Sequence, residues 1–192
     1  LGGPTQWKDR AYPVNPTSQL VRSAGLRLLI VALLGAGPIL GDEPPPSGQP
    51  ERCPSFQLAD QYETLHAISF PATNHLVLIV ADRPGAEQID PWIAALKSPY
   101  PQHLRLIGVA DVSAVPALLR RTIRGRFKDK YAHSILLDWA GDLKRALSPS
   151  PGQANVFLLA PNGVIIARAA GAATTARQSQ MIAEIDRALA RA

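Results

Sequence analysis

The sequence of 192 residues contains a single cysteine, Cys53. One cysteine excludes an internal disulfide, a C-x-x-C redox centre and a cysteine-rich zinc site. Two roles of the thiol stay open, namely a bond to another chain and a reaction of the thiol itself. We expect a free or intermolecularly paired thiol, and Cys53 is the one candidate for a reactive thiol.

Motifs for metals, nucleotides and activated serine are also missing. No two of the histidines have the H-x-x-x-H or H-x-x-E-H spacing of metal sites; they are His66, His75, His103 and His133. The patterns G-x-S-x-G, G-x-x-x-x-G-K-[ST] and G-x-G-x-x-G do not occur in residues 55–192. Asp82, Glu87 and Asp90 gather at a predicted helix start, where carboxylates ordinarily cap the helix. We therefore predict no metal, no cofactor and no catalytic residue.

The positive charge is concentrated at the N-terminus. The formal net charge is +5, of which residues 1–41 carry +3 and residues 42–192 carry +2. The larger part of the chain is therefore nearly neutral, and we expect no nucleic-acid partner.

Residues 21–41 have the pattern of a secretory signal. Arg22 and Arg27 precede an uncharged run of 14 residues from Leu28 to Gly41, and this run is shorter than the roughly 20 residues of a relaxed membrane span. We interpret residues 21–41 as a cleaved signal, with a retained membrane anchor as the alternative because no good small-x-small cleavage site is present. Both interpretations predict an exported, periplasmic or otherwise extracytoplasmic protein. Residues 1–20 are an uncertain extension without periodicity, and an over-extended gene start is one hypothesis for them.

A proline-rich stretch separates this segment from the rest. Residues 42–54 contain Pro44, Pro45, Pro46 and Pro50. This composition favours an extended, solvated tether, so we predict a folded domain over residues 55–192.

The domain is predicted to alternate strands and helices. Residues 75–81 and 104–110 are apolar runs typical of buried strands, and Asn162-Gly163 predicts a hairpin turn. Further strands are expected over residues 56–62, 64–68, 134–138, 155–160 and 164–168, and helices over residues 85–96, 116–130, 142–147 and 175–190. This order predicts an α/β domain with a mixed sheet flanked by helices.

Four stretches resemble the thioredoxin-like superfamily, of the peroxiredoxin and cytochrome-maturation type. Strand 75–81, then Arg83-Pro84-Gly85-Ala86, then a helix containing Pro91 is similar to the strand, C-x-x-C and proline-kinked helix of a thioredoxin. Residues 56–61, 137–143 and 156–165 resemble the F-x-L-x-D, D-x-x-G-x-L and F-L-I-D-x-x-G-x-I segments of the family. The resemblance covers residues 55–192 and implies a thioredoxin-like fold.

The same resemblance implies that the redox site is missing. Counting back from Pro91 places Arg83 and Ala86 at the two cysteine positions, and Ala154 or Asn155 at the position of the family's cis-proline. A thiolate at a helix N-terminus is the basis of the family's redox activity. We expect thiol exchange to be lost and the former active site to be a partner-binding groove formed by Asp82, Arg83, Pro84, Gly85, Ala86, Ala154 and Asn155.

A second candidate contact surface is a basic helix face. Six basic residues fall within the eleven residues from Arg120 to Lys130. Arg120, Arg124 and Lys128 share one face by their i, i+4, i+8 spacing, with Arg121 beside them. Such a face could dock on anionic lipid headgroups or an acidic partner. The opposite side is expected to be buried through Leu118, Leu119, Ile123 and Phe127.

Three functions remain open on the sequence alone. The favoured hypothesis is a redox-inactive thioredoxin-fold module that binds or scaffolds a protein or the membrane surface. The alternatives are a thiol-dependent oxidoreductase or peroxidase that uses Cys53, and an accessory subunit of a membrane complex that residues 21–41 anchor. The partner and the oligomeric state are not predicted.

Overall fold

The computed structural model describes residues 50–97, 100 and 104–191. The predicted extension, the signal or anchor, residues 42–49 of the tether and His103 lie outside the described residues. The chain divides into two compact units, and the described residues belong to the second, which spans Pro44–Ala192. No helix among the described residues is both long and apolar enough to cross a membrane.

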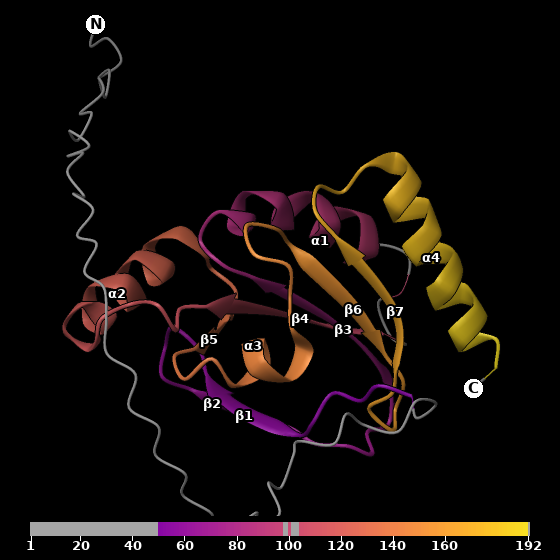
Figure 1. The fold of residues 1–192 in the computed structure, drawn as a ribbon, viewed down its shortest axis with the longest axis horizontal. Coiled ribbons are helices and arrows are strands. Elements are labelled where there is room, and N and C mark those ends of the chain that lie inside the picture. Colours follow the sequence, from indigo (N-terminus) through magenta and orange to yellow (C-terminus); the bar gives the residue numbers. More distant parts are fainter. Residues whose placement is uncertain (1–49, 98–99, 101–103, 192) are drawn as a thin grey trace, which may run out of the picture. The chain divides into compact units, whose positions relative to one another are not determined.

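The centre of the domain is a mixed five-stranded sheet in the order β5-β4-β3-β6-β7 (Figure 1). Strands β3 (His75–Ala81), β4 (Leu104–Asp111) and β5 (Leu136–Asp138) run parallel to one another. Strands β6 (Asn155–Leu159) and β7 (Ile165–Ala170) form a hairpin, and β6 pairs antiparallel with β3. A separate antiparallel pair consists of β1 (Phe56–Ala59) and β2 (Leu65–Ile68).

Helical segments connect the strands. The 3-10 turn η1 (Gly85–Gln88) leads into α1 (Ile89–Lys97), and the 3-10 turn η2 (Ala117–Leu119) leads into α2 (Arg120–Lys130). The remaining helices are α3 (Asp142–Leu147) and α4 (Thr175–Leu189). Pro91 lies in the first turn of α1, where its missing N–H costs no helical hydrogen bond.

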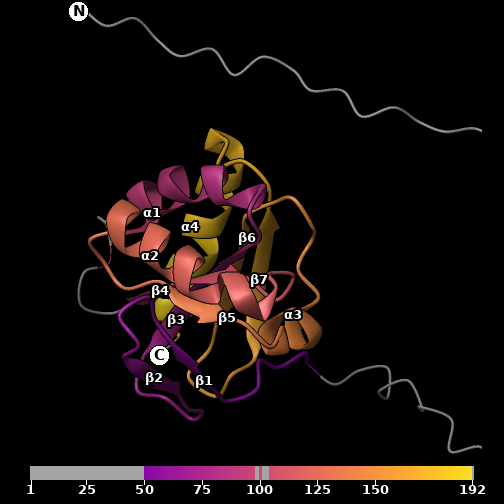
Figure 2. The ribbon, with the colours of Figure 1, turned by 90° about the vertical axis from the view of Figure 1, so that its left-hand side faces the viewer.

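Both faces of the sheet are covered (Figures 1 and 2). Alternate residues of β3 point to opposite faces, and every residue of β3 is buried. On one face Val77 and Ile79 pack with Trp92 of α1 and Ile185 of α4. On the other face Leu78 of β3 belongs to an apolar cluster with side chains of the β1–β2 pair and of α3. These side chains include Leu58, Ile68, Leu143 and Leu147. The predicted α/β domain with a mixed sheet flanked by helices is confirmed.

A smaller apolar cluster holds α2 beside β4 and β5. Ile123 and Phe127 pack against Val112, Ile135 and Leu137, as the sequence predicts. Leu118 and Leu119 do not follow the prediction, since 90% of Leu118 and 47% of Leu119 are exposed. Both leucines lie in the 3-10 turn η2 before α2, so the apolar stripe of α2 through Ile123 and Phe127 does not continue through them.

The folded domain begins before residue 55. The Cys53 N–H donates to the Gly163 carbonyl at 2.9 Å, and the Ile165 N–H donates to the Glu51 carbonyl at 2.9 Å. Arg52 forms an isolated antiparallel bridge with Val164. The sequence predicted a solvated tether through residue 54, but residues 51–53 pair with the β6–β7 hairpin, because this hairpin offers free backbone groups beside them.

Candidate functional site

The structure brings the predicted groove residues together at the carboxyl end of β3. The loop that follows β3 carries Asp82 to Ala86, and the loop that precedes β6 carries Gln153 to Asn155. At Gly85 a Cβ would lie closer than 3.0 Å to the carbonyl carbon and oxygen of Gln153, a separation that real Cβ atoms essentially never show. The two loops are therefore in contact, and glycine is required at position 85.

Asp82 links the two loops. Its Oδ1 accepts a hydrogen bond from the Gly85 N–H at 2.9 Å, and its Oδ2 accepts one from the Gly152 N–H at 2.7 Å. The Ala86 N–H also donates to the Asp82 carbonyl at 3.0 Å. The carboxylate therefore caps the start of η1 and holds the loop before β6 at the same time.

Gln88 makes a second link, which the sequence analysis missed. Its Oε1 accepts from the Ala154 N–H at 3.2 Å, and its Nε2 donates to the Gly152 carbonyl at 3.3 Å. The Ala154 carbonyl accepts from the Gly171 N–H at 2.9 Å. Both backbone groups of Ala154 are thus paired within the domain, so they are not free to bind the backbone of an extended peptide. No local pattern could have identified Gln88, because its partners are more than 60 residues away in the sequence.

Asn155 shapes the second loop rather than presenting a binding group. It is 4% exposed. Its Oδ1 accepts from the Ser150 N–H at 2.8 Å, and its Nδ2 donates to the carbonyls of Ser150 at 3.0 Å and Gln153 at 2.9 Å. Of the predicted groove residues, Arg83 and Pro84 are exposed and Asp82 and Ala86 are half-buried. A partner at this surface would therefore touch mainly Arg83 and Pro84.

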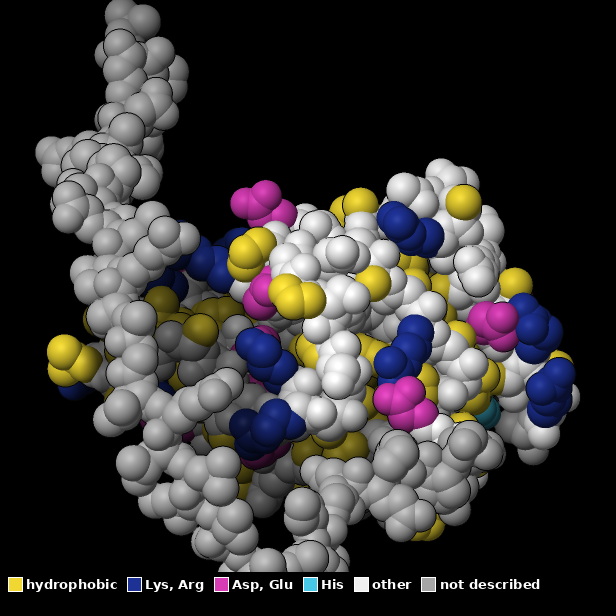
Figure 3. Space-filling view, viewed as in Figure 1, with side chains coloured by type: hydrophobic (Ala, Val, Ile, Leu, Met, Phe, Trp, Pro, Cys, Tyr) yellow, Lys and Arg dark blue, Asp and Glu magenta, His cyan; other side chains and the backbone are white. Residues whose placement is uncertain are grey.

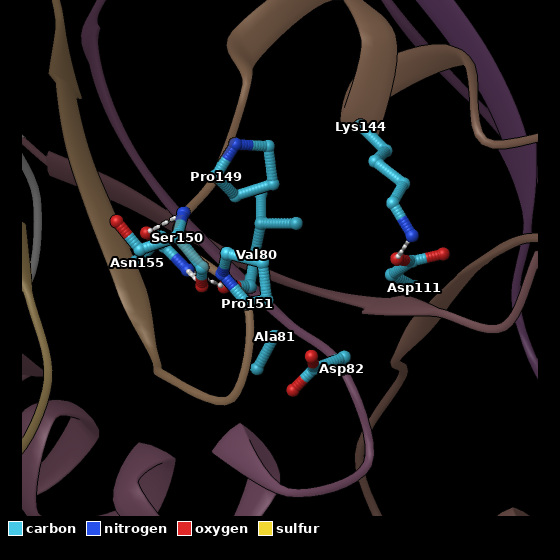
Figure 4. A pocket seen from close by; sticks show the side chains of 9 residues that line it. All are labelled: Val80, Ala81, Asp82, Asp111, Lys144, Pro149, Ser150, Pro151 and Asn155. Carbon is cyan, nitrogen blue, oxygen red and sulfur yellow. Dashed lines mark hydrogen bonds and ion pairs between the residues drawn. The ribbon is translucent and has the colours of Figure 1, made fainter.

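A small cavity adjoins these loops (Figure 4). Its lining includes Asp82, Asp111, Lys144 and Asn155, and its volume is about 30 Å³, which is room for little more than one water. Lys144 Nζ lies 2.9 Å from Asp111 Oδ2. Burial raises the pKa of Asp111, but hydrogen bonds from Ser113 and Lys144 outweigh burial and hold this pKa below its usual value. The cavity therefore contains a formed ion pair and has no space for an organic ligand.

Cys53 lies at the other end of the sheet from Arg83 and Ala86. It contacts the β6–β7 hairpin through Gly163, and β6 is antiparallel to β3 with Leu159 opposite Leu76. The side chain is 3% exposed and belongs to the apolar core. Burial raises the pKa of the Cys53 thiol to about 11, so the thiol is protonated at neutral pH. The structure thus separates the single thiol from the loop that the sequence resemblance equates with a redox site.

The predicted basic face is only partly open to solvent. Arg124 pairs with Glu63 at 2.5 Å, and the guanidinium carbons of Arg120 and Arg124 lie 5.4 Å and 6.0 Å from the Trp139 ring centroid. Lys128 Nζ lies 5.9 Å from the ring centroid of Tyr62. Arg121 is exposed. Three of the four predicted residues therefore lie against the domain, while their charges remain near its surface.

One further polar cluster joins the β1–β2 pair to β5. Asp60 Oδ2 lies 2.9 Å from His66 Nε2 and accepts a hydrogen bond from Ser134 Oγ at 2.8 Å. Ser134 Oγ and His66 Nε2 are 3.2 Å apart. Serine, histidine and aspartate occur together here, but both partners contact the same imidazole nitrogen. A nucleophilic triad uses the two nitrogens separately, so this cluster lacks that geometry. The described residues contain no group of three or more His, Cys, Asp or Glu side chains that could hold a metal.

No protein-family profile and no curated protein sequence matches the chain. Solved structures do match it. The thiol:disulfide interchange protein DsbE from Chlorobium tepidum is 17% identical, with a TM-score of 0.57 over 73% of this chain and 96% of that one. The exposed lipoprotein thioredoxin Etrx1 from Streptococcus pneumoniae is 12% identical, with a TM-score of 0.54 over 68% and 98%. StoA from Bacillus subtilis is 17% identical, with a TM-score of 0.51 over 68% and 96%.

These likenesses confirm the fold that the sequence predicted. The sequence identities are low, but each match covers nearly the full length of the solved chain. The sequence itself supplies no cysteine after residue 53. The chain has the thioredoxin-like fold of thiol:disulfide interchange proteins and lacks the cysteines of their active site.

Proposed function

We propose that this protein is an exported, redox-inactive thioredoxin-fold module that binds or scaffolds a partner at a membrane surface. The observation that carries the proposal is the pair Arg83 and Ala86 at the start of η1, where a redox protein of this fold needs thiols. Without sulfur at either position, the helix start has no nucleophile to activate.

The packing of the two loops supports the same proposal. Asp82 and Gln88 occupy the backbone N–H groups of Gly152 and Ala154 with internal hydrogen bonds. These two N–H groups are therefore not free to bind the backbone of an extended peptide. The exposed surface of Arg83 and Pro84 is then a site for binding rather than for exchange.

Export is supported by two independent features. Residues 21–41 have the charged start and short apolar run of a secretory signal. One solved structure of the same fold is described as an exposed lipoprotein.

An assay of disulfide reduction tests redox inactivity. With dithiothreitol as reductant, we expect a model protein disulfide to be reduced no faster in the presence of the wild-type protein than in its absence. The Arg83→Cys/Ala86→Cys double variant is the positive control, since it places two thiols at a helix start that lowers thiol pKa values. If the wild-type protein is active and Cys53→Ser abolishes the activity, the protein is a thiol-dependent oxidoreductase and the proposal fails. A peroxide-reduction assay with the same variants separates the peroxidase alternative.

Fractionation of native cells tests the location. A mature N-terminus near Asp42 in the soluble fraction would indicate a free secreted domain. An N-terminus at or before Val21 in the membrane fraction would indicate a tethered domain, and co-purifying membrane proteins would then favour the accessory-subunit alternative. A cytoplasmic precursor that keeps residues 21–41 would contradict export.

A further inference from the structure

The start of the second helical segment exposes apolar side chains. Pro116 and Ala117 are exposed, and 90% of Leu118 and 47% of Leu119 are open to solvent. Leu118 is the most exposed large hydrophobic side chain among the described residues. A single exposed leucine is ordinary, but two adjacent ones beside exposed proline and alanine form a small apolar projection.

Positive charges directly follow this projection. Arg120 and Arg121 come next in the chain and are exposed, and Arg126 is exposed further along α2. The first turn of α2 contains no acidic residue. In Figure 3, dark-blue basic and yellow apolar side chains lie together over the region of α2 at the left.

The charge is least compensated at the leucine end. Within the described residues, Arg124 is the one cation of α2 in an ion pair, and its partner is Glu63. Asp129 lies at the far end of the helix, and the charges of Asp90 and Glu87 act on Lys130 there. The apolar projection therefore borders the part of α2 with the largest excess of positive charge.

We propose that Leu118, Leu119, Arg120 and Arg121, here called the leucine–arginine corner, dock on an anionic lipid bilayer. Leu118 and Leu119 enter the boundary between headgroups and acyl chains, and the two arginines bind lipid phosphates at headgroup level. This inference rests on the proposed membrane-surface function and names the surface that performs it.

A bilayer fits this corner better than a protein partner does. A projecting leucine needs a preformed pocket on a protein, whereas acyl chains rearrange around it. Long arginine side chains can keep their charge at the headgroups while the neighbouring leucines go deeper. Anionic headgroups also complement the uncompensated charge. Weak membrane binding of this kind needs two contributions, buried apolar area and positive charge, and the corner supplies both.

The test uses the full chain with an environment-sensitive fluorophore on a cysteine placed at Leu118. The native Cys53 is buried, so labelling of the folded Leu118→Cys variant is selective. The matched control is Leu65→Cys, because Leu65 on β2 is also an exposed leucine, at 59%, and no arginine or lysine lies within ten residues of it in the sequence. The probes are vesicles of phosphatidylcholine alone and of phosphatidylcholine with about one third phosphatidylglycerol.

We expect the emission at position 118 to shift to the blue with anionic vesicles only, and to return in high salt. The probe at position 65 is expected to stay unchanged. Arg120→Gln/Arg121→Gln should raise the lipid concentration at half-maximal shift about thirtyfold, from about fivefold for each charge at the membrane surface. With the fluorophore moved to Leu119→Cys, the Leu118→Ser substitution should raise the lipid concentration at half-maximal shift about tenfold. Residues 21–41 are common to all variants and cannot produce these differences.

Each other result contradicts the corner in a different way. An equal shift with neutral and anionic vesicles would remove the role of the arginines. A chain that binds vesicles without a shift at position 118 would overturn the corner and leave the membrane-surface function standing. A chain that binds neither type of vesicle would contradict both, and a shift only with an acidic protein would replace the bilayer by that partner.

Discussion

Asp60 is a buried carboxylate that holds the loop between β1 and β2. Its Oδ1 accepts from the N–H groups of Tyr62 at 2.8 Å and Thr64 at 3.0 Å, and its Oδ2 contacts His66 and Ser134. Burial raises the pKa of Asp60, but these hydrogen bonds together outweigh burial and lower the pKa below its usual value. The folded state therefore stabilises the charged form of Asp60 more than the unfolded state does.

This arrangement predicts how stability changes with pH. A lowered folded pKa contributes stability above the unfolded value of about 3.9, and that contribution is lost as pH falls through the folded pKa. We expect Asp60→Asn to lower the free energy of unfolding by about 1–3 kcal/mol at pH 7, and by progressively less below about pH 4. Urea titrations of wild type and Asp60→Asn at several pH values measure the loss of unfolding free energy at pH 7 and its decrease at low pH. Asp142→Asn, at a side chain that is 63% exposed, is the control with little effect. A difference between wild type and Asp60→Asn that does not change with pH would contradict the prediction.

At the scale of elements, the contact between η1 and the loop before β6 depends on Gly85. A Cβ there would overlap the backbone of Gln153, and backbone cannot move away as a flexible side chain can. We expect Gly85→Ala to lower the free energy of unfolding by at least about 2 kcal/mol.

Gly125 provides the matched control for this substitution. It lies within α2, and a Cβ there would meet nothing within 4 Å. Gly125→Ala should therefore stabilise the protein by about 0.4–1 kcal/mol, because alanine loses less backbone entropy on folding. Thermal unfolding of both variants measures the two opposite signs. Equal effects of the two substitutions would mean that the η1 contact is not tight.

The elements differ in how far the sequence could predict them. β3 and β4 were predictable because both are long apolar runs, and α3 was predicted with the bounds that the structure has, Asp142–Leu147. Leu118 and Leu119 were assigned to the wrong side because the stripe through Ile123 and Phe127 does not extend to η2. The roles of Asp82 and Gln88 could not be predicted, since their partners lie in a loop about 65–70 residues later. Contacts of this range leave no local periodicity.

At the scale of the whole molecule, the two ends of the sheet have different roles. The sequence resemblance predicts the position of a redox site at the end with Arg83 and Ala86. There, hydrogen bonds of Asp82 and Gln88 hold two loops together, and an ion pair lines a cavity of about 30 Å³. At the opposite end, residues 51–53 lead into the domain and pair with the β6–β7 hairpin. The single thiol therefore lies where the chain enters the fold, at the end of the sheet opposite Arg83 and Ala86.

This entry of the chain predicts where the folding unit begins. A fragment of residues 44–192 keeps the hydrogen bonds of Glu51 and Cys53 to the hairpin and the burial of Cys53, whereas a fragment of residues 55–192 loses all of them. We expect the shorter fragment to be less stable by about 2–4 kcal/mol, from two backbone hydrogen bonds and one buried apolar side chain. Denaturant unfolding of the two fragments measures the difference. Cys53→Ala in the longer fragment is the control that separates the side chain from the backbone pairing, and it should account for less than half of the loss. Equal stability of the two fragments would place the start of the domain at residue 55, as the proline-rich composition alone suggested.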